Sequence, residues 1–544
     1  MADTTQVAPD ETAPPTGGQA RLGWALVLIS VAQLMVVLDS TIANIALPYI
    51  GKDLDIAQGN LQWIVTGYAL AFGGLLLLGG RLADLYGRRR IFMIGVAIFA
   101  VASFLGGLAQ NEAMLLGSRG LQGLGAALAS PAALALITTT FPAGPQRNRA
   151  FGVYAAMSGA GAAVGLILGG WLTGSALGDI DGWRLTFLIN VPIGLAAAFM
   201  APRVFAESER HKGELDIPGA ITGTAGLLAL VYGLSRAGDR NYGWSDTWTV
   251  ASLVVGVALL LVFAVVESRV EHPLLPVRVF ANRTRAASFA AMMLMPAAMF
   301  SMFFFLSLFI QNVMGYSSLE AGFAFLPFSF GIVIAAAISS QLIAKVDARF
   351  ISGTGMALAA VALFMFSRIS VDDSPANLLR VATSNGALQL GDNVSYWTDI
   401  FPYIVLMALG MGATFVPLTL TAVHHLRAED SGIGSGVLNT MQQVGGALGL
   451  ATLSTVALHF STNRADEIAP GLSAQARDLT PDQFGQLIQL GSFTEGATMA
   501  FLVGSVMILA ASAVVWIFLN VKHTELATDG PEAVEALESV IPAV

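Results

Sequence analysis

One acidic residue, Asp39, lies in the middle of a long apolar stretch, in the sequence LDSTIANIALP (38–48). It is the only acidic residue well inside any of the first six apolar stretches. A carboxylate at membrane depth is costly, so it normally faces a cavity and takes part in ion or proton chemistry. Burial favours the neutral form of a carboxyl group, as a reversible proton carrier requires. We therefore expect Asp39 to carry a proton; the alternative is a structural, hydrogen-bonding aspartate.

Arg119 and Gln122 are three residues apart in SRGLQGLGAA and hence lie on one face of a helix. An arginine stays charged at physiological pH, so it cannot itself carry the proton. It can stabilise the ionised form of a neighbouring carboxyl group or bind water in a cavity. We expect Arg119 to modulate Asp39 electrostatically, and a purely structural ion pair is the alternative.

A polar loop, GGRLADLYGRRRIF, follows the second apolar stretch. Gly80 and Gly87 permit a tight connection between helices. Asp84 can pair with an arginine, and Arg88 and Arg89 hold the loop on the cytoplasmic side. These five residues are expected to form a gating latch between two halves of the molecule; the alternative is a simple membrane anchor.

The chain repeats itself. GVYAAMSGAGAAVGL (152–166) aligns with GVLNTMQQVGGALGL (436–450) without gaps. Glycines at every fourth position make a surface for close helix packing, and these are Gly161, Gly165 and Gly169 in the first copy and Gly445 and Gly449 in the second. Two copies of a six-span unit are one architecture of secondary transporters. Chance similarity between helices rich in glycine and alanine is the alternative.

Methionine and phenylalanine crowd the stretch AAMMLMPAAMFSMFFFLSLF. Such side chains form adaptable apolar surfaces that repack around different ligands. We expect a substrate cavity between the halves, lined by Asn44, Gln122, Met295, Met299, Phe303, Asn439 and Gln443. Lipid contact or plain core packing is the alternative for any one of them.

The composition excludes most soluble functions. Of the 544 residues 55% are hydrophobic and only 12% are charged, and the mean hydropathy is +0.69. A soluble domain carries about 25% charged residues. There is no cysteine for a disulfide, a thiolate metal site or a nucleophile, and the six histidines supply zinc chemistry poorly. Neither a phosphate-binding G-x-x-x-x-G-K-[ST] motif nor H-E-x-x-H occurs, so a resident ATPase or metalloprotease is not expected.

Apolar stretches of about 20 residues, the length that spans a bilayer, occur fourteen times. The sequence predicts an all-α integral membrane protein with two six-helix bundles and two additional helices inserted between them. Lys and Arg are more frequent in the loops on the side of the N-terminus, which predicts that both termini are cytoplasmic.

The predicted domains follow from these spans: a disordered N-terminal tail (1–20), an N-terminal bundle (21–205), the inserted helices with linkers (206–285), a C-terminal bundle (286–520) and a cytoplasmic tail (521–544). Within the C-terminal bundle we expect two long outer loops, 369–399 and 461–495. Thr480-Pro481-Asp482 in the second of these is a plausible helix start.

Taken in order, these motifs resemble the fourteen-span drug:proton antiporter branch (EmrB/QacA type) of the major facilitator superfamily. LDSTIANIALP, LQWIVTGYAL, GRLADLYGRRR, RGLQG, the glycine-rich fifth span and WRLTFLINVPIG each occur at the span where the family would place them. The resemblance covers about residues 20–520. Leu166 stands where a proline is usual in the fifth-span motif of antiporters, and Gln442 where an arginine is expected.

The resemblance implies an exporter of amphipathic drugs or antibiotics across the bacterial cytoplasmic membrane, driven by the proton gradient without a cofactor. Substrate, protons and the lipid bilayer are the expected partners; nucleic acid is not, and a monomer is expected. The alternatives are a dedicated exporter of one natural product or lipid, a transporter-like membrane sensor without transport, and an intramembrane enzyme, for which no catalytic set of residues stands out.

Overall fold

The computed structural model describes residues 16–528 except 143, 179, 208–214, 272, 385, 425–430 and 476–478. The regular elements of the described part are all helices, apart from one isolated bridge between Leu177 and Ile180. Thirteen helical segments are long and apolar enough to cross a membrane, and the apolar part of a further helix, Gly161–Thr173, is shorter. The fourteen predicted spans each correspond to one of these segments. Helices suit these sequences because a helix satisfies its own backbone groups where no water is present.

The N-terminal half forms one bundle around its own apolar core. Its helices are α1 (Thr16–Asp53), α2 (Gln62–Tyr86), α3 (Arg88–Gly107), α4 (Glu112–Thr140), α5 (Pro145–Thr173), and α6 (Gly182–Leu188) with α7 (Asn190–Val204) as one interrupted span. A short 3-10 helix, η1 (Gln58–Asn60), precedes α2.

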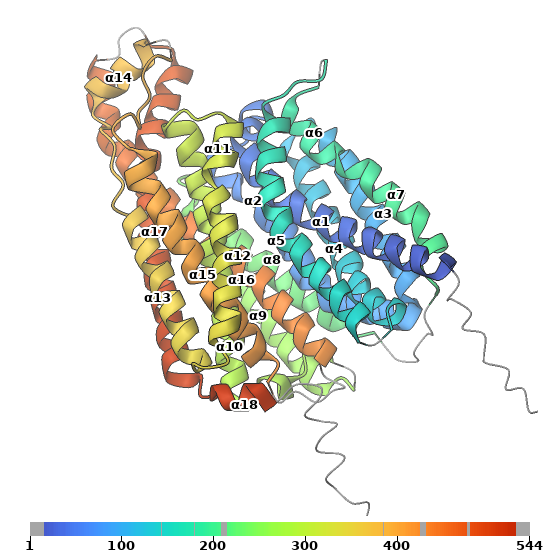
Figure 1. Ribbon diagram of the computed structural model, residues 1–544. Coiled ribbons are helices and arrows are strands. Elements are labelled where there is room, and N and C mark those ends of the chain that lie inside the picture. Colours follow the sequence, from blue (N-terminus) through green and yellow to red (C-terminus); the bar gives the residue numbers. More distant parts are fainter. Residues whose placement is uncertain are drawn as a thin grey trace, which may run out of the picture.

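The C-terminal half forms a second bundle beside the first (Figure 1). Its helices are α10 (Arg283–Leu308) continued by η3 (Phe309–Val313), α11 (Ser318–Ala324) with α12 (Leu326–Leu342), α13 (Ala348–Phe366), η4 (Tyr396–Ile400) with α15 (Phe401–Ala422), α16 (Ser431–Gln475) and α17 (Pro481–Phe518). We call the end of the molecule with η1 and α14 (Pro375–Thr383) the distal end. The end where α1 begins and α18 (His523–Thr528) lies is the proximal end.

The two inserted helices, α8 (Ile217–Gly238) and α9 (Thr247–Arg269), form an antiparallel hairpin. Carboxylate caps begin both helices: Asp216 Oδ1 accepts from Gly219 N, and Asp246 Oδ2 accepts from Thr249 N. A 3-10 helix, η2 (Val277–Phe280), connects the hairpin to α10.

The hairpin packs through α8 against α2 and α16, one helix from each bundle. A small apolar cluster joins the three helices and consists of Ala69, Leu70, Val231, Ala447 and Ala451. Trp63 Nε1 donates to Ser235 Oγ over 3.1 Å, and Thr455 Oγ1 donates to the Leu234 carbonyl over 2.7 Å. The inserted helices therefore cover the seam between α2 and α16.

The distal connections are more helical than we expected. Most of 461–495 continues α16 and α17, and α14 lies within 369–399 and packs against both (Figure 1). Thr480 begins α17 with a capping box to Gln483 at the predicted helix start. Arg464 is paired with Asp373 at 2.6 Å, so ion pairs fix these helical extensions where sequence polarity indicated loops. The predicted tails at 1–20 and 521–544 fall largely outside the described residues.

Candidate functional site

Asp39 and Arg119 form a buried ion pair in the middle of the N-terminal bundle. Arg119 NH1 lies 2.5 Å from Asp39 Oδ2, and the two residues are 1% and 3% exposed. The other carboxylate oxygen, Oδ1, accepts from Gln122 Nε2 at 2.9 Å and from Asn190 Nδ2 at 3.1 Å. The two residues named from the sequence are thus in direct contact, and Arg119, Gln122 and Asn190 all donate hydrogen bonds to the Asp39 carboxylate.

The Arg119 guanidinium has further partners on two helices. Its Nε donates to the Ile64 carbonyl at 2.8 Å, and NH1 also donates to Gln122 Oε1 at 2.8 Å. Its plane lies over the Tyr68 ring, 4.5 Å from the centroid. Gln122 in turn donates to Ser103 Oγ. The Arg119 guanidinium is therefore held by α2 and α4 as well as by Asp39.

Three members of this cluster were not among the predicted site residues: Tyr68, Ser103 and Asn190. Asn190 stands in WRLTFLINVPIG, so the family motif held a signal for it. Tyr68 and Ser103 are ordinary polar residues of apolar helices. Only the packing of α2 and α3 on α4 brings them to Arg119 and Gln122.

The glycine stripe of α5 positions the helix that carries Asp39. A side chain at Gly165 would collide with Thr41 of α1, and Cβ atoms at Gly161 and Gly169 would lie about 3 Å from α1 atoms. The absence of side chains at these positions lets α5 and α1 approach closely.

The C-terminal half repeats this packing. A side chain at Gly445 would meet Met293 of α10, and one at Gly449 would meet Ala297. In the N-terminal half, Gly161 meets Val37 and Gly165 meets Thr41 in the same way. Val37 and Thr41 of α1 therefore correspond to Met293 and Ala297 of α10. A second match supports the duplication: Gly95 packs on Gly125 as Gly355 packs on Gly410.

In this register the C-terminal half has an apolar cluster where the N-terminal half has its ion pair. Counting back from Thr41 and Ala297 makes Met295 the equivalent of Asp39. Counting back from Gly125 and Gly410 makes Ile404 the equivalent of Arg119 and Met407 that of Gln122. All three apolar side chains are at most 3% exposed. The duplicated fold therefore tolerates either a satisfied ionic cluster or a packed apolar one at this depth.

The polar loop after α2 contacts other parts of the N-terminal half. Gly87 has φ = +104°, which favours glycine, whereas Gly80 has room for a Cβ. Asp84 pairs with Arg88 at 3.2 Å, and Arg88 also donates to the Ala135 carbonyl. Arg89 pairs with Glu207 at 3.3 Å, in the segment after α7. These named contacts tie α2, α3, α4 and α7 together at the proximal end.

GRLADLYGRRRI (80–91) has a degraded counterpart in SQLIAKVDARFI (340–351), and this second copy of the loop holds the C-terminal helix. Asp347 Oδ1 accepts from the backbone N–H of His523 at 2.9 Å and lies 2.9 Å from its ring Nδ1. These hydrogen bonds lower the pKa of Asp347 below its ordinary value. The position that is Gly87 in the first copy thus anchors α18 in the second.

The predicted cavity residues are scattered. Gln122 belongs to the Asp39 cluster, and Met295 is core. Met299 is half-buried, and Phe303 packs against Phe325 and Phe328 at 5.0 Å. Asn44, Asn439 and Gln443 lie on α1 and α16: Asn439 is exposed, Gln443 is half-buried beside Gly73, and the Asn44 carbonyl accepts from Ser307 Oγ.

The two departures from the family pattern have structural accommodations. Leu166 is fully buried in the larger apolar core of the molecule, most of which belongs to the C-terminal half. Its carbonyl lies close to Gly322 of α11. Gln442 is neutral and half-buried, and its Nε2 donates weakly to Met292 Sδ at 3.7 Å.

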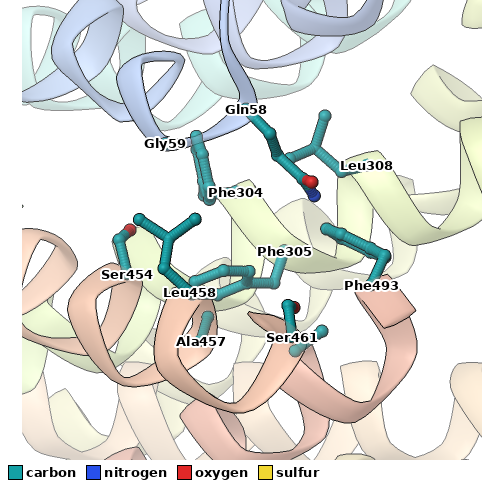
Figure 2. A pocket seen from close by; sticks show the side chains of 11 residues that line it. Gln58, Gly59, Phe304, Phe305, Leu308, Ser454, Ala457, Leu458, Ser461 and Phe493 are labelled. Carbon is teal, nitrogen blue, oxygen red and sulfur yellow. The ribbon is translucent and has the colours of Figure 1, made fainter. Parts of the chain in front are cut away.

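The seam between the bundles is closed at the distal end. Gln489 Nε2 donates to Gln58 Oε1 at 3.1 Å, and Ser318 Oγ donates to the Gly170 carbonyl at 2.8 Å. Figure 2 shows Gln58 and Gly59 of the N-terminal half above Leu458 and the aromatic side chains of the C-terminal half. The cavity there has a volume of about 20 Å³, room for about one water molecule.

Comparison with known proteins agrees with this architecture. The model of the Major Facilitator Superfamily matches residues 29–450. The chain is 40% identical to the puromycin resistance protein pur8 of Streptomyces alboniger (82% of this chain, 84% of the relative). It is 37% identical to the cephamycin export protein CmcT of Amycolatopsis lactamdurans (82% and 87%).

A bacterial homologue of the human lysosomal transporter Spinster, solved in an inward-facing, unoccupied conformation, shares the fold with a TM-score of 0.61 at 18% identity (93% of this chain, 98% of that chain). The chain is therefore a multi-pass membrane protein, and it belongs to the major facilitator superfamily.

Proposed function

We propose that this chain is a proton-coupled exporter of amphipathic antibiotics, with Asp39 as the proton-binding group. The observation that carries the proposal is the buried Asp39–Arg119 pair, a titratable group at membrane depth in a chain related to antibiotic export and resistance proteins. The proton gradient would supply the energy, without a cofactor.

Proton binding at Asp39 changes the contacts of α1. The ionised carboxylate accepts three hydrogen bonds, from Arg119, Gln122 and Asn190. A proton on Oδ2 displaces the Arg119 N–H, while Arg119 keeps the Ile64 carbonyl, Gln122 and the Tyr68 ring. Loading and release of the proton therefore exchange one charged contact between α1 and α4, while the other contacts of Arg119 are kept.

This local exchange is connected to the seam. α1 contacts the C-terminal half through the Asn44 carbonyl and Ser307, and α5, which packs on α1, contacts α11 at Gly170 and Ser318. A shift of α1 on protonation would therefore act on the closed distal seam. Rocking of the two halves about a midplane cavity is the form of alternating access that such duplicated folds use.

We further propose that both termini are cytoplasmic, that the protein works as a monomer in the bacterial cytoplasmic membrane, and that nucleic acid is not a partner. The excess of Lys and Arg at the proximal end supports this orientation. In that orientation the closed distal seam faces outward. The substrate would contact the half-buried Met299, the exposed Asn439 and the half-buried Gln443 between the halves.

The test uses inside-out vesicles with an acidic interior. Addition of unrelated cationic dyes, biocides and antibiotics should release protons from vesicles with the wild-type protein but not with Asp39→Asn. Asp482→Asn is the matched control, because it removes an equal charge from an exposed position at the start of α17. Undiminished release by Asp39→Asn would refute the assignment of the proton site. Proton release with compounds of one chemical class only would favour a dedicated exporter. No proton release with any of the compounds would favour a membrane sensor without transport.

A further inference from the structure

Two acidic side chains at the proximal base of the inserted hairpin are buried and face each other. Asp216 caps α8 and is 2% exposed, and Glu267 in the last turns of α9 is 4% exposed. A Cβ built on Gly219 would touch an oxygen of both, which shows that the two groups meet beside that glycine.

Each carboxyl group uses one oxygen for the backbone and directs the other at its neighbour. Asp216 Oδ1 accepts from Gly219 N, and Glu267 Oε2 accepts from Leu275 N, both at 2.8 Å. The remaining oxygens, Oδ2 of Asp216 and Oε1 of Glu267, are buried without a donor, and these are the two that approach Gly219. Ionised carboxylates only accept, so two of them repel, whereas one proton between them makes a strong hydrogen bond.

Among the described residues, no cation neutralises this pair. The charged group that meets Glu267 beside Gly219 is Asp216. Arg269, Glu271 and Arg278, which follow along the chain, have exposed side chains.

The helices packed on α8 do not supply a counter-charge either. The charged residues of α2 at this end are Arg81 and Asp84, of which Asp84 pairs with Arg88. The described part of α16 carries none before His459. The described residues contain no group of three or more metal-binding side chains, and two carboxylates are too few ligands for a hard cation. Two buried acceptor oxygens that face each other fit a proton, which one carboxyl group can donate to the other.

We propose that Asp216 and Glu267 together bind one proton, shared between Oδ2 and Oε1, and that this proton fastens the base of the inserted hairpin. In the protonated pair the start of α8, the end of α9 and the connection at Leu275 are joined by one chain of hydrogen bonds. Loss of the proton leaves two buried like charges, which separate the helix ends. The site lies outside both bundles, is distinct from the Asp39 cluster, and does not depend on the proposed export function.

Infrared spectroscopy tests the proton directly. In mildly alkaline buffer exposed carboxyl groups are ionised, so the C=O stretch of a protonated carboxyl group reports buried ones. We expect this band in the wild-type protein, its shift in D₂O, and its loss in both Asp216→Asn and Glu267→Gln, because the amide N–H replaces the shared proton. Glu271→Gln, an exposed neighbour, should leave the band intact. A wild-type protein without the band, or a band that survives both substitutions, overturns the proposal.

The stability of the protein provides a second readout. A proton held by the folded state makes the wild-type protein less stable as the pH rises, because the unfolded state gives up that proton more readily. Glu267→Gln fits the site, since its amide oxygen can accept from Leu275 N while its amide N–H donates to Asp216 Oδ2. We expect this variant to fold, to lose that part of the pH dependence of the melting temperature, and to keep drug-induced proton release. An unchanged pH dependence in Glu267→Gln overturns the proposal.

Discussion

Replacement of Asp39 alone by methionine should destabilise the N-terminal bundle more than replacement of the whole ionic cluster. The single change Asp39→Met leaves the Arg119 guanidinium buried and without its carboxylate. Removal of one partner of a buried ion pair costs about 3–5 kcal/mol. Arg119 keeps its bonds to the Ile64 carbonyl and to Gln122, so we expect a loss near the middle of that range, about 4 kcal/mol.

The triple change Asp39→Met, Arg119→Ile and Gln122→Met copies the apolar cluster at the equivalent positions of the C-terminal half. It removes the buried charge, and the amide of Asn190 and the hydroxyl of Ser103 then lose one partner each. Each such loss costs about 1 kcal/mol, so the triple variant should lose about 2 kcal/mol in free energy of unfolding.

The assay is reversible unfolding of the purified protein in mixed detergent micelles, followed by tryptophan fluorescence. The triple variant should be about 2 kcal/mol more stable than Asp39→Met and should show no drug-induced proton release. If the triple variant is no more stable than the single one, the equivalence of the two clusters, and with it the register derived from the glycine contacts, is wrong.

Three further outcomes follow from local geometry. Gly165→Val should overpack the α5–α1 contact, at a cost of about 1–3 kcal/mol, and reduce proton release, whereas Gly152→Val, which meets open space, should leave folding and transport nearly unchanged. Gly87→Ala, at φ = +104°, should destabilise the protein by about 1–2 kcal/mol in the same unfolding assay; a stability equal to wild type would contradict the backbone argument. Because His523 lowers the pKa of Asp347, the contact stabilises the folded state above the ordinary pKa of an aspartate and is lost as the pH falls. The protection factors of the α18 amides, which are exchange rates corrected for the intrinsic rate at each pH, should therefore fall on acidification in the wild-type protein; in Asp347→Asn they should already be low at neutral pH and respond little to acid.

The sequence predicted best what depends on local composition. The fourteen spans follow from apolar runs of bilayer length, and the packing role of Gly165 and Gly449 follows from their spacing and from the repeat. The proximity of Asp39 and Arg119 was also predictable, because a buried charge needs a partner and few candidates exist in the N-terminal spans.

What the sequence did not predict depends on tertiary neighbours. Tyr68 and Ser103 join the ionic cluster only through the packing of α2 and α3 on α4. Met295 was expected in a substrate cavity because its helix is rich in methionine, but a local pattern cannot distinguish a cavity wall from the core, where the side chain lies. The segment 461–495 is polar enough for a loop, yet ion pairs and packing on α14 keep it helical.

The inserted hairpin makes the two flanks of the molecule different in the plane of the membrane, because it covers the contact between the bundles on one flank only. On one flank α8 covers the meeting line of α2 and α16, and α9 presents side chains such as Leu261, 63% exposed, to the lipid. On the opposite flank α5 meets α11 and α12, and no additional helix among the described elements covers them. Of the two lines along which the bundles meet, the one at α5, α11 and α12 is therefore the one that no inserted helix separates from the lipid. Neighbouring proteins that pack against α9 would leave this second line exposed to the lipid.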